Sequence, residues 1–246
     1  IVNSVSEALE VFESIRGEPM HRRARVEFYA SHVGLHLPYE QAQTRFLAHR
    51  NRWYNLTTNF PWIGMRTVEL DGAHVEYFSG IANPIGDKVG SSLSDEHVRA
   101  LVERLNPDNE PGRLTLITRF GASQIEEQLP RLIAAVRKTR KDVLWVCDPM
   151  HGNTETTSKG YKTRRFDNIL SELQSAFRIH RAHDSYLGGV HLELSGDNIT
   201  ECIGGARGLS EAELSRAYQS RVDPRLNYEQ AMEIAMLIAG RLRPDS

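Results

Sequence analysis

The stretch from Asp142 to Asn153 constrains the fold of this chain more than any other. A run of apolar, strand-forming residues, 143–146, is ended by Asp148 and Pro149 and followed by a loop with polar side chains. In α/β proteins, the loop after the carboxyl end of a parallel strand carries binding and catalytic groups. The sequence therefore predicts a buried strand here and makes His151 a candidate site residue, although a single loop histidine is more often an incidental surface residue.

Strands and helices alternate along the rest of the chain. Apolar runs that predict strands are centred on Gly34, Trp62, Lys88, Leu116, Trp145 and His191. Apolar residues at helical spacing predict helices at residues 3–16, 38–50, 94–105, 166–177 and 227–242. Further helix N-termini are indicated by three serine–glutamate capping pairs, Ser4 with Glu7, Ser123 with Glu126, and Ser210 with Glu213. Residues 53–60 are predicted to form a loop.

This alternation predicts an α/β fold with a parallel sheet, and polar residues at the strand ends favour the (β/α)8 TIM-barrel type. We expect one domain over residues 1–246. The chain supplies only about six of the eight strands that a closed barrel needs. We therefore expect either further chain before Ile1 or a second subunit to cover the open sheet edges.

Polar residues also follow two later segments. His191, Glu193 and Ser195 alternate with apolar residues and would share one face of a strand, and Asp223 lies in a loop before the last helix. His151, Glu193 and Asp223 together offer one imidazole and two carboxylates, a set that suits a divalent metal with open positions. Glu193 could instead be a satisfied carboxylate inside the barrel, and Asp223 could be a turn residue before Pro224.

Composition excludes several classes of partner. The net charge of -2 gives no overall attraction to nucleic acid or to an anionic membrane, so an anionic substrate needs a local cluster of cations. The sequence has no apolar run close to the roughly 20 residues of a membrane span and no signal-peptide pattern. Its two cysteines, Cys147 and Cys202, form no disulfide framework and fit a reducing compartment, which predicts a cytoplasmic protein.

Several longer motifs occur in a fixed order from about residue 28 to the end. They are WIGMRT (62–67), LDGAHVE (70–76), NPIGDKVG (83–90), GRLTLITR (112–119), CDPMHGNT (147–154), GYKTR (160–164), residues 188–205 and DPRLN (223–227). In these motifs the chain resembles the class II 3-deoxy-D-arabino-heptulosonate 7-phosphate (DAHP) synthases of the shikimate pathway, whose relatives include members of phenazine gene clusters.

The resemblance implies a transferase that condenses phosphoenolpyruvate with erythrose 4-phosphate in a metal-dependent, aldol-type reaction. The metal would be Mn, Co, Mg or Zn, and the protein a homo-oligomer. The implied metal ligands are His151, Glu193 and Asp223. The implied substrate-binding residues are Trp62, Arg66, Lys88, Arg119 and Lys162, and the implied catalytic residues are Lys88, His151 and Lys162.

The chain also departs from the family pattern. Met65 stands where the family usually has a glutamate, Val33 stands where it again has a glutamate, residues 55–59 replace another polar motif, and Asp87 replaces an apolar residue. The first two strands of the family, which carry a cysteine ligand and a basic Lys-Pro-Arg-Ser motif, have no counterpart in this sequence. Two alternatives therefore stay open: an enzyme with a changed acceptor or reaction, or a catalytically silent homologue that acts through a partner chain.

Overall fold

The computed structural model describes residues 27–241. The strands and helices described below belong to one unit, which begins at Ser31. Residues 1–30 form a separate unit, of which only 27–30 are described. The predicted helix at residues 3–16, with its Ser4–Glu7 capping pair, lies outside the described residues. The prediction of a single domain over the whole chain stays a prediction.

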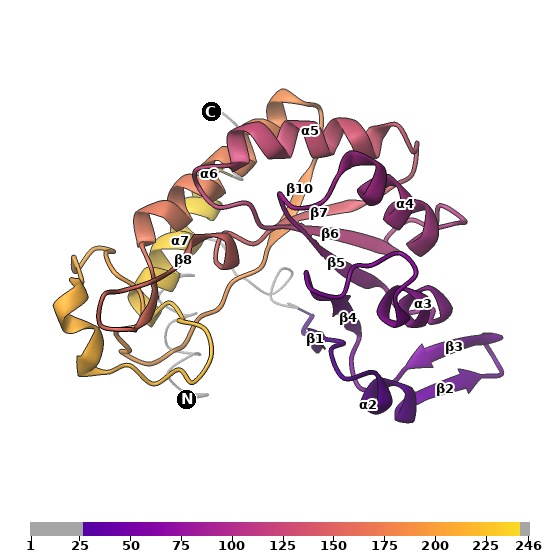
Figure 1. The fold of residues 1–246 in the computed structure, drawn as a ribbon, viewed down its shortest axis with the longest axis horizontal. Helices are drawn as coiled ribbons and strands as arrows, with labels where there is room; N and C mark the ends of the chain where they lie inside the picture. The colour runs from indigo at the N-terminus through magenta and orange to yellow at the C-terminus, as the bar shows by residue number, and fades with distance from the viewer. Residues whose placement is uncertain (1–26, 242–246) are drawn as a thin grey trace, which may run out of the picture. The chain divides into compact units, whose positions relative to one another are not determined.

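A six-stranded parallel sheet forms the centre of this unit (Figure 1). Its strands lie in the order β1 (Ser31–Val33), β4 (Phe60–Ile63), β5 (Ile85–Val89), β6 (Leu114–Thr118), β7 (Leu144–Cys147) and β10 (Leu187–Val190). Each strand pairs in parallel with the next main-sheet strand along the chain. Such an unreversed order is that of a barrel segment, whereas a doubly wound sheet reverses direction at its centre. All six predicted strands are present, although two of the predicted centres, Gly34 and His191, lie just beyond the ends of β1 and β10.

The middle strands are buried on both faces. Every residue of β5 and of β6 is buried. Parallel strands covered on both sides have nearly continuous apolar sequences, which is why β6 was recognisable without alternation. Strand β7 has a similar apolar run, but it is only partly buried, since Leu144 is exposed. On β5, the side chains of Asp87 and Lys88 point to opposite faces of the sheet because successive residues of a strand alternate.

Helices follow the strands and lie along one face of the sheet (Figure 1). They are α3 (Ala73–Gly80), α4 (Asp95–Leu105), α5 (Ile125–Arg137) and α6 (Phe166–Ala182). The Ser94 side chain accepts a hydrogen bond from the backbone N–H of His97 and so caps α4, whose apolar stripe is buried. The last helix, α7 (Tyr228–Arg241), buries Gln230 and Ile234. No helix within residues 27–241 is long and apolar enough to cross a membrane.

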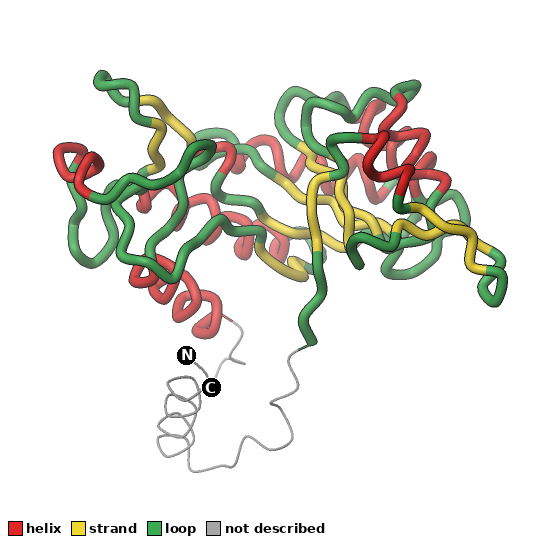
Figure 2. The backbone as a smooth tube through the Cα atoms, turned by 90° about the horizontal axis from the view of Figure 1, so that it is seen from below, coloured by secondary structure: helices red, strands yellow, loops and turns green. Residues whose placement is uncertain are grey.

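The predicted helix at 38–50 is largely wrong, and the loop predicted at 53–60 is correct only for residues 56–59. Helix α2 covers only Leu37–Ala42, and an antiparallel hairpin follows, made of β2 (Thr44–Leu47) and β3 (Arg52–Asn55). The hairpin is favoured by a cross-strand aromatic pair, Phe46 and Trp53, with ring centroids 5.5 Å apart. Asn51 adopts a φ of 53° in its turn, a conformation that asparagine tolerates better than most residues. A second hairpin, β8 (Thr154–Thr156) and β9 (Lys162–Arg164), was also not predicted, and both hairpins stand apart from the main sheet (Figure 2).

Other helix boundaries differ from the prediction in instructive ways. Helix α3 was missed. Ser123 does not cap α5, which begins after Gln124 without a side-chain cap. Ser210 and Glu213 do form the predicted capping box, but the element they open is a short 3-10 helix, η3 (Glu211–Arg216).

The strand predicted around residues 188–195 ends earlier than expected. Strand β10 stops at Val190, and the chain then leaves the sheet. The following segment pairs instead with residues before α7, because Ser195 N donates to Leu226 O and Leu226 N donates to Glu193 O, at 2.8 and 2.9 Å. His191 and Glu193 are therefore loop residues beyond a strand end, and not members of one strand face.

Candidate active site at the carboxyl ends of the strands

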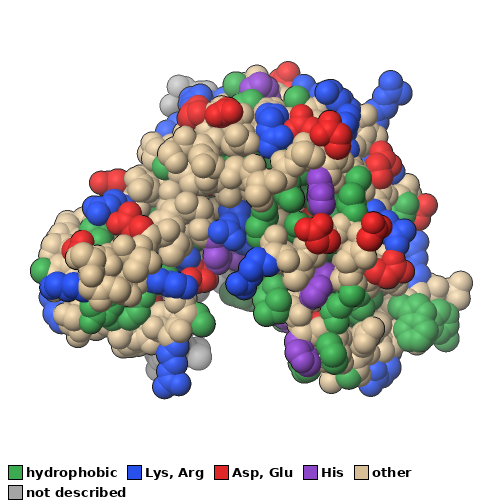
Figure 3. Space-filling model, viewed as in Figure 1, with side chains coloured by type: hydrophobic (Ala, Val, Ile, Leu, Met, Phe, Trp, Pro, Cys, Tyr) green, Lys and Arg blue, Asp and Glu red, His purple; other side chains and the backbone are tan. Residues whose placement is uncertain are grey.

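The carboxyl ends of the sheet strands open into a cavity of about 680 Å³. Figure 3 shows a hollow in which basic, histidine and acidic side chains gather. The cavity is lined by Val33, Leu35, Trp62, Gly64, Met65, Arg66, Thr67, Lys88, Arg119, His151, Thr154, Lys162, His191, Glu193 and Asp223. All the predicted site residues are thus brought together in one cavity, while their individual roles stay predictions.

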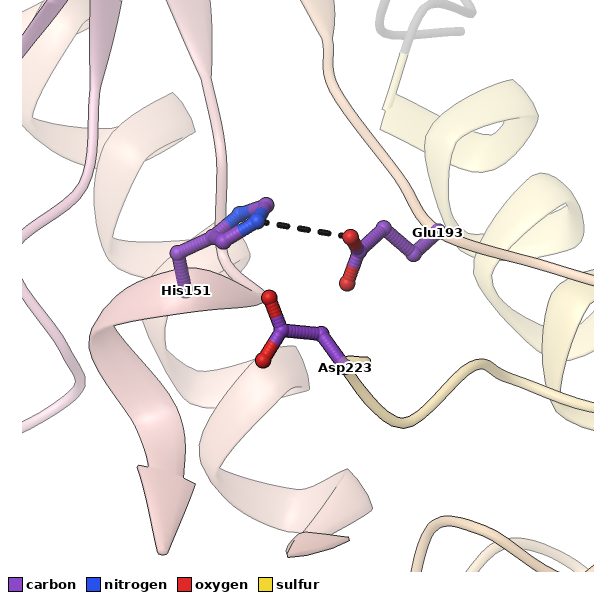
Figure 4. Close-up of side chains that lie close together, drawn as sticks. All are labelled: His151, Glu193 and Asp223. Carbon is purple, nitrogen blue, oxygen red and sulfur yellow. Dashed lines mark ion pairs between the residues drawn. The ribbon is translucent and has the colours of Figure 1, made fainter. Parts of the chain in front are cut away.

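His151, Glu193 and Asp223 form a group that could hold a metal ion. His151 begins the short 3-10 helix η2 (His151–Asn153) after β7, Glu193 follows β10, and Asp223 lies in the loop before α7. One ligand atom from each residue lies within 4.8 Å of the other two, and His151 Nε2 is 3.4 Å from Glu193 Oε1 (Figure 4). Ligand atoms at about 2.0–2.2 Å from one ion lie at most about 4.4 Å apart, so small side-chain movements would bring all three atoms to one ion. The donor set therefore fits a divalent metal.

Asp148 fixes the orientation of His151. Its buried carboxylate accepts a hydrogen bond from His151 Nδ1 at 2.7 Å and others from the backbone N–H groups of Met150 and His151. This leaves Nε2 of His151 facing Glu193, the carboxylate–histidine arrangement that commonly supports a metal ligand. Burial alone would lower the pKa of His151, but Asp148 and Glu193 outweigh it and raise the pKa to about 8.

Arg164 fixes the orientation of Glu193. Its fully buried guanidinium donates from Nη1 to Glu193 Oε2 at 2.6 Å, and also to the backbone oxygen of Pro224. Although burial raises the pKa of Glu193, the partners His151 and Arg164 lower it overall. One buried cation therefore holds both the glutamate and the loop that carries Asp223.

Four cationic side chains reach the cavity from separate elements. Lys88 lies on β5 and is ion-paired with Asp148, and burial lowers its pKa. Arg119 directly follows β6 and donates to the backbone oxygen of His151 at 3.0 Å. Arg66 lies in the turn after β4 and is exposed, while Lys162 Nζ on β9 is 3.3 Å from Asp223 Oδ1. This concentration of positive charge beside a metal-type ligand set suits an anionic substrate.

His191 is a cavity residue that the sequence did not single out as functional. It is the first residue after β10, and its ring packs edge-on against Trp62 with centroids 5.1 Å apart. Burial and then the charge of Lys88 are the largest causes that lower the pKa of His191, to about 4, so the imidazole is neutral. The available signal was its place two residues before Glu193, on the same predicted strand face.

The departures from the family pattern fall in different places. Val33 and Met65 line the cavity, so that side is apolar where the family has acids. Asn55 is buried away from the cavity, where it bonds to Glu40 and Asn83. Among the described lining residues the only carboxylates are Glu193 and Asp223.

Comparison with known proteins identifies the family. The sequence profile of the class-II DAHP synthetase family matches residues 1–239. The chain belongs to this family. Its resemblance in the motifs is thereby confirmed.

Three relatives of this chain are called phospho-2-dehydro-3-deoxyheptonate aldolase. The protein of Neurospora crassa is 45% identical over 260 residues, covering 99% of this chain and 54% of its own length. That of Mycolicibacterium smegmatis is 46% identical over 222 residues, or 88% of this chain and 48% of its own. That of Streptomyces coelicolor is 41% identical over 243 residues, or 99% of this chain and 54% of its own. The chain thus spans about half the length of these relatives.

Proposed function

We propose that this site carries out the DAHP synthase reaction, the metal-dependent, aldol-type condensation of phosphoenolpyruvate with erythrose 4-phosphate. The observation that carries the proposal is the presence, in one cavity, of the group His151, Glu193 and Asp223 beside the cations Lys88 and Arg119. Family membership and the names of the three relatives support it. The cytoplasmic location and the homo-oligomer stay predictions that go with this function.

Phosphoenolpyruvate carries a carboxylate and a phosphate and therefore needs several fixed donors. Arg119 is oriented by its bond to the backbone of His151, and Lys88 by its ion pair with Asp148. Both groups are in place before the substrate arrives, so little reorganisation accompanies binding. Arg66, exposed at the rim, can close on the same anion, and the Trp62 ring borders the space between them.

The metal would be held by His151 Nε2, Glu193 Oε1 and a carboxylate oxygen of Asp223. When bound, such an ion acts as a Lewis acid that polarises the aldehyde oxygen of the aldose phosphate. The protein side chains keep this arrangement fixed: Asp148 sets the tautomer of His151, and Arg164 turns one oxygen of Glu193 towards the site. Lys162, beside Asp223, is placed to donate a proton to the oxygen that becomes a hydroxyl.

A second candidate, a changed acceptor substrate, is favoured by the cavity wall. Val33, Leu35 and Met65 make one side apolar, and both carboxylates of the described lining belong to the metal group. That side therefore offers no further carboxylate to accept a proton from a hydroxyl group or from the attacking water. An acceptor with fewer hydroxyl groups than erythrose 4-phosphate would fit it better.

The two candidates are separated by metal analysis followed by turnover. The chain is saturated in turn with Mn, Co, Mg and Zn, and loss of phosphoenolpyruvate is measured with a panel of aldose phosphates. We expect consumption that depends on the metal, with erythrose 4-phosphate among the substrates used. Consumption with other aldehydes only would favour the changed acceptor. Metal binding without consumption of phosphoenolpyruvate by any acceptor would contradict both and leave the silent homologue.

Arg119→Ala is expected to weaken phosphoenolpyruvate binding more than about tenfold, because a charge-assisted contact to the anion is lost. Isothermal titration calorimetry in the presence of Mn²⁺ measures the effect. Arg131→Ala is the matched control, since Arg131 pairs with Asp95 on the helices away from the cavity. An unchanged affinity in the Arg119 variant would contradict its role in the anion site.

A further inference from the structure

Glu172 is a buried carboxylate that bonds to two loops of the site but does not line the cavity. It lies on α6 with no exposed surface and is not part of the cavity lining. Its Oε1 accepts hydrogen bonds from the backbone N–H groups of Phe120 and Gly121, at 2.9 and 3.0 Å. Its Oε2 accepts a hydrogen bond from Asn153 Nδ2 at 2.7 Å. One side chain therefore holds the loop after β6 and the loop after β7.

These two loops carry different parts of the site. Phe120 and Gly121 directly follow Arg119, the anion-binding residue, while Asn153 lies two residues after His151, the metal ligand. The loops are also bonded to each other, because Asn153 Oδ1 accepts from Ala122 N at 2.9 Å and Arg119 donates to the backbone of His151 at 3.0 Å.

The backbones of the two loops are in direct contact. Gly121 has a φ of +86°, and a Cβ added to it would lie 2.7 Å from Gly152 O. A Cβ on Gly152 would lie only 2.3 Å from Gly121 N. The glycines therefore allow a close approach that side chains would prevent. A displacement of one loop must be transmitted to the other.

We propose that Glu172 is a positioning residue that locks the Arg119 loop and the His151 loop into one unit, so that the anion site and the metal site are set together. This inference rests on the proposed function. Glu172 contacts neither substrate nor metal and acts through Phe120, Gly121 and Asn153.

Burying the carboxyl group of Glu172 costs free energy, which supports a role for this residue beyond packing. Burial raises the pKa of Glu172 to about 7, even though the backbone donors of Phe120 and Gly121 oppose the shift. An apolar side chain at this position of α6 would avoid the cost of burying a carboxyl group. It would, however, leave three donors of the two loops without their acceptor.

The test compares two Glu172 variants with a control on the same helix. In Glu172→Ala all three acceptor contacts are lost, and we expect the affinities for Mn²⁺ and for phosphoenolpyruvate both to fall about tenfold, as for other residues that orient metal ligands. Binding of Mn²⁺ is followed by electron paramagnetic resonance and that of phosphoenolpyruvate by calorimetry. Leu173→Ala removes a buried side chain next to Glu172 but none of the hydrogen bonds from Glu172 to the two loops, and both affinities should stay within about twofold of wild type.

Glu172→Gln is nearly isosteric and keeps the proposal testable if the alanine variant does not fold. Its remaining oxygen can still accept from Phe120 and Gly121, but its NH2 group meets the NH2 group of Asn153. Because the two loops are bonded to each other, we expect the affinities for Mn²⁺ and for phosphoenolpyruvate to fall together, each by less than in Glu172→Ala. A role in fold stability alone would lower the melting temperature and leave both affinities of the folded protein unchanged.

Several outcomes would overturn the inference. Wild-type affinities in both Glu172 variants would show that the two loops hold their places without this carboxylate. An equal loss of both affinities in Leu173→Ala would mean that the Glu172 variants act through general destabilisation of the fold. A wild-type chain that binds neither Mn²⁺ nor phosphoenolpyruvate would overturn the proposed function and this inference with it, whereas the first two outcomes leave the proposed function intact.

Discussion

His151→Ala is expected to weaken binding of Mn²⁺ by at least about a hundredfold and to lower kcat/KM by at least about a thousandfold. The substitution removes the nitrogen of the metal group and leaves Glu193 and Asp223, which already have cationic partners in Arg164 and Lys162. These ion pairs would then compete with the metal for both carboxylates. Electron paramagnetic resonance of free Mn²⁺ and steady-state kinetics measure the two effects.

His49→Ala serves as the control for this prediction, because His49 is an exposed histidine in the turn of the β2–β3 hairpin. It should leave both quantities unchanged. If His151→Ala retained wild-type affinity for Mn²⁺, the ion would be bound elsewhere and the proposed ligand set would be wrong.

Asp87→Val is expected to stabilise the protein, by at least about 3 kcal/mol at pH 8. Asp87 is fully buried on β5, and neither of its carboxylate oxygens has a hydrogen-bond partner among the described residues. Burial raises the pKa of Asp87 to about 8. A valine of suitable shape for a strand would remove a buried polar group that receives no compensation.

The stabilising effect should depend on pH in a defined direction. The pKa of Asp87 is about 8 in the folded protein and about 3.9 in an unfolded chain, so the folded state binds the proton more tightly. Stability from this group is fully present below about pH 4 and is lost as the pH rises towards 8, by up to about 1.4 kcal/mol per unit. Urea unfolding at pH 5, 6, 7 and 8 should show this slope in the wild type.

Asp87→Asn removes the negative charge but keeps a polar side chain, so it separates the effects of charge and of polarity on stability. It should remove the contribution of Asp87 to the pH slope, as Asp87→Val does, while other groups with raised pKa values, such as Glu172, keep theirs. It should gain less stability than Asp87→Val because a polar amide stays buried without partners. Parallel pH profiles for the wild type and both variants would contradict the assignment of the slope to Asp87.

The strands of the main sheet were the most predictable part of the fold. Strands β6 and β7 are short apolar runs that end at polar residues, and a buried parallel strand needs little else. The β2–β3 hairpin was mistaken for a helix and a loop because residues 41–45 include good helix formers, whereas the pairing of Phe46 with Trp53 appears only once the chain folds back. The helix propensity of these residues was outweighed by a cross-strand contact between side chains that are separated in sequence, and the sequence pattern does not show such a contact.

The segment after Val190 illustrates a different limit of prediction from sequence. Its alternation of polar and apolar residues did indicate extended chain, and residues 193–195 do pair with another segment. The partner is the backbone of Leu226, far along the sequence, and not the neighbouring strand β7. Periodicity shows that a segment is extended but does not identify what it pairs with.

The gathering of the predicted site residues in one cavity followed from their positions at strand ends and from the family motifs. Arg164 and Glu172 were missed because the groups they hold, Glu193 and the backbone of Phe120 and Gly121, are distant in sequence. A buried charge is recognisable only from its surroundings, which the order of residues does not give. Sequence therefore indicated the residues that face the cavity better than those that support them.

The order of the strands also bears on how the protein is made. Because each strand of the main sheet pairs with the next one synthesised, the sheet can grow by one strand and helix at a time as the chain leaves the ribosome. Lys88 and Arg119 would be oriented once the loop after β7 has formed, because that loop supplies Asp148 and the backbone oxygen of His151. Glu193 and Asp223 lie beyond the last strand, and their loops pair with each other through Leu226. A nascent chain should thus present its anion-binding groups well before it can hold a metal ion.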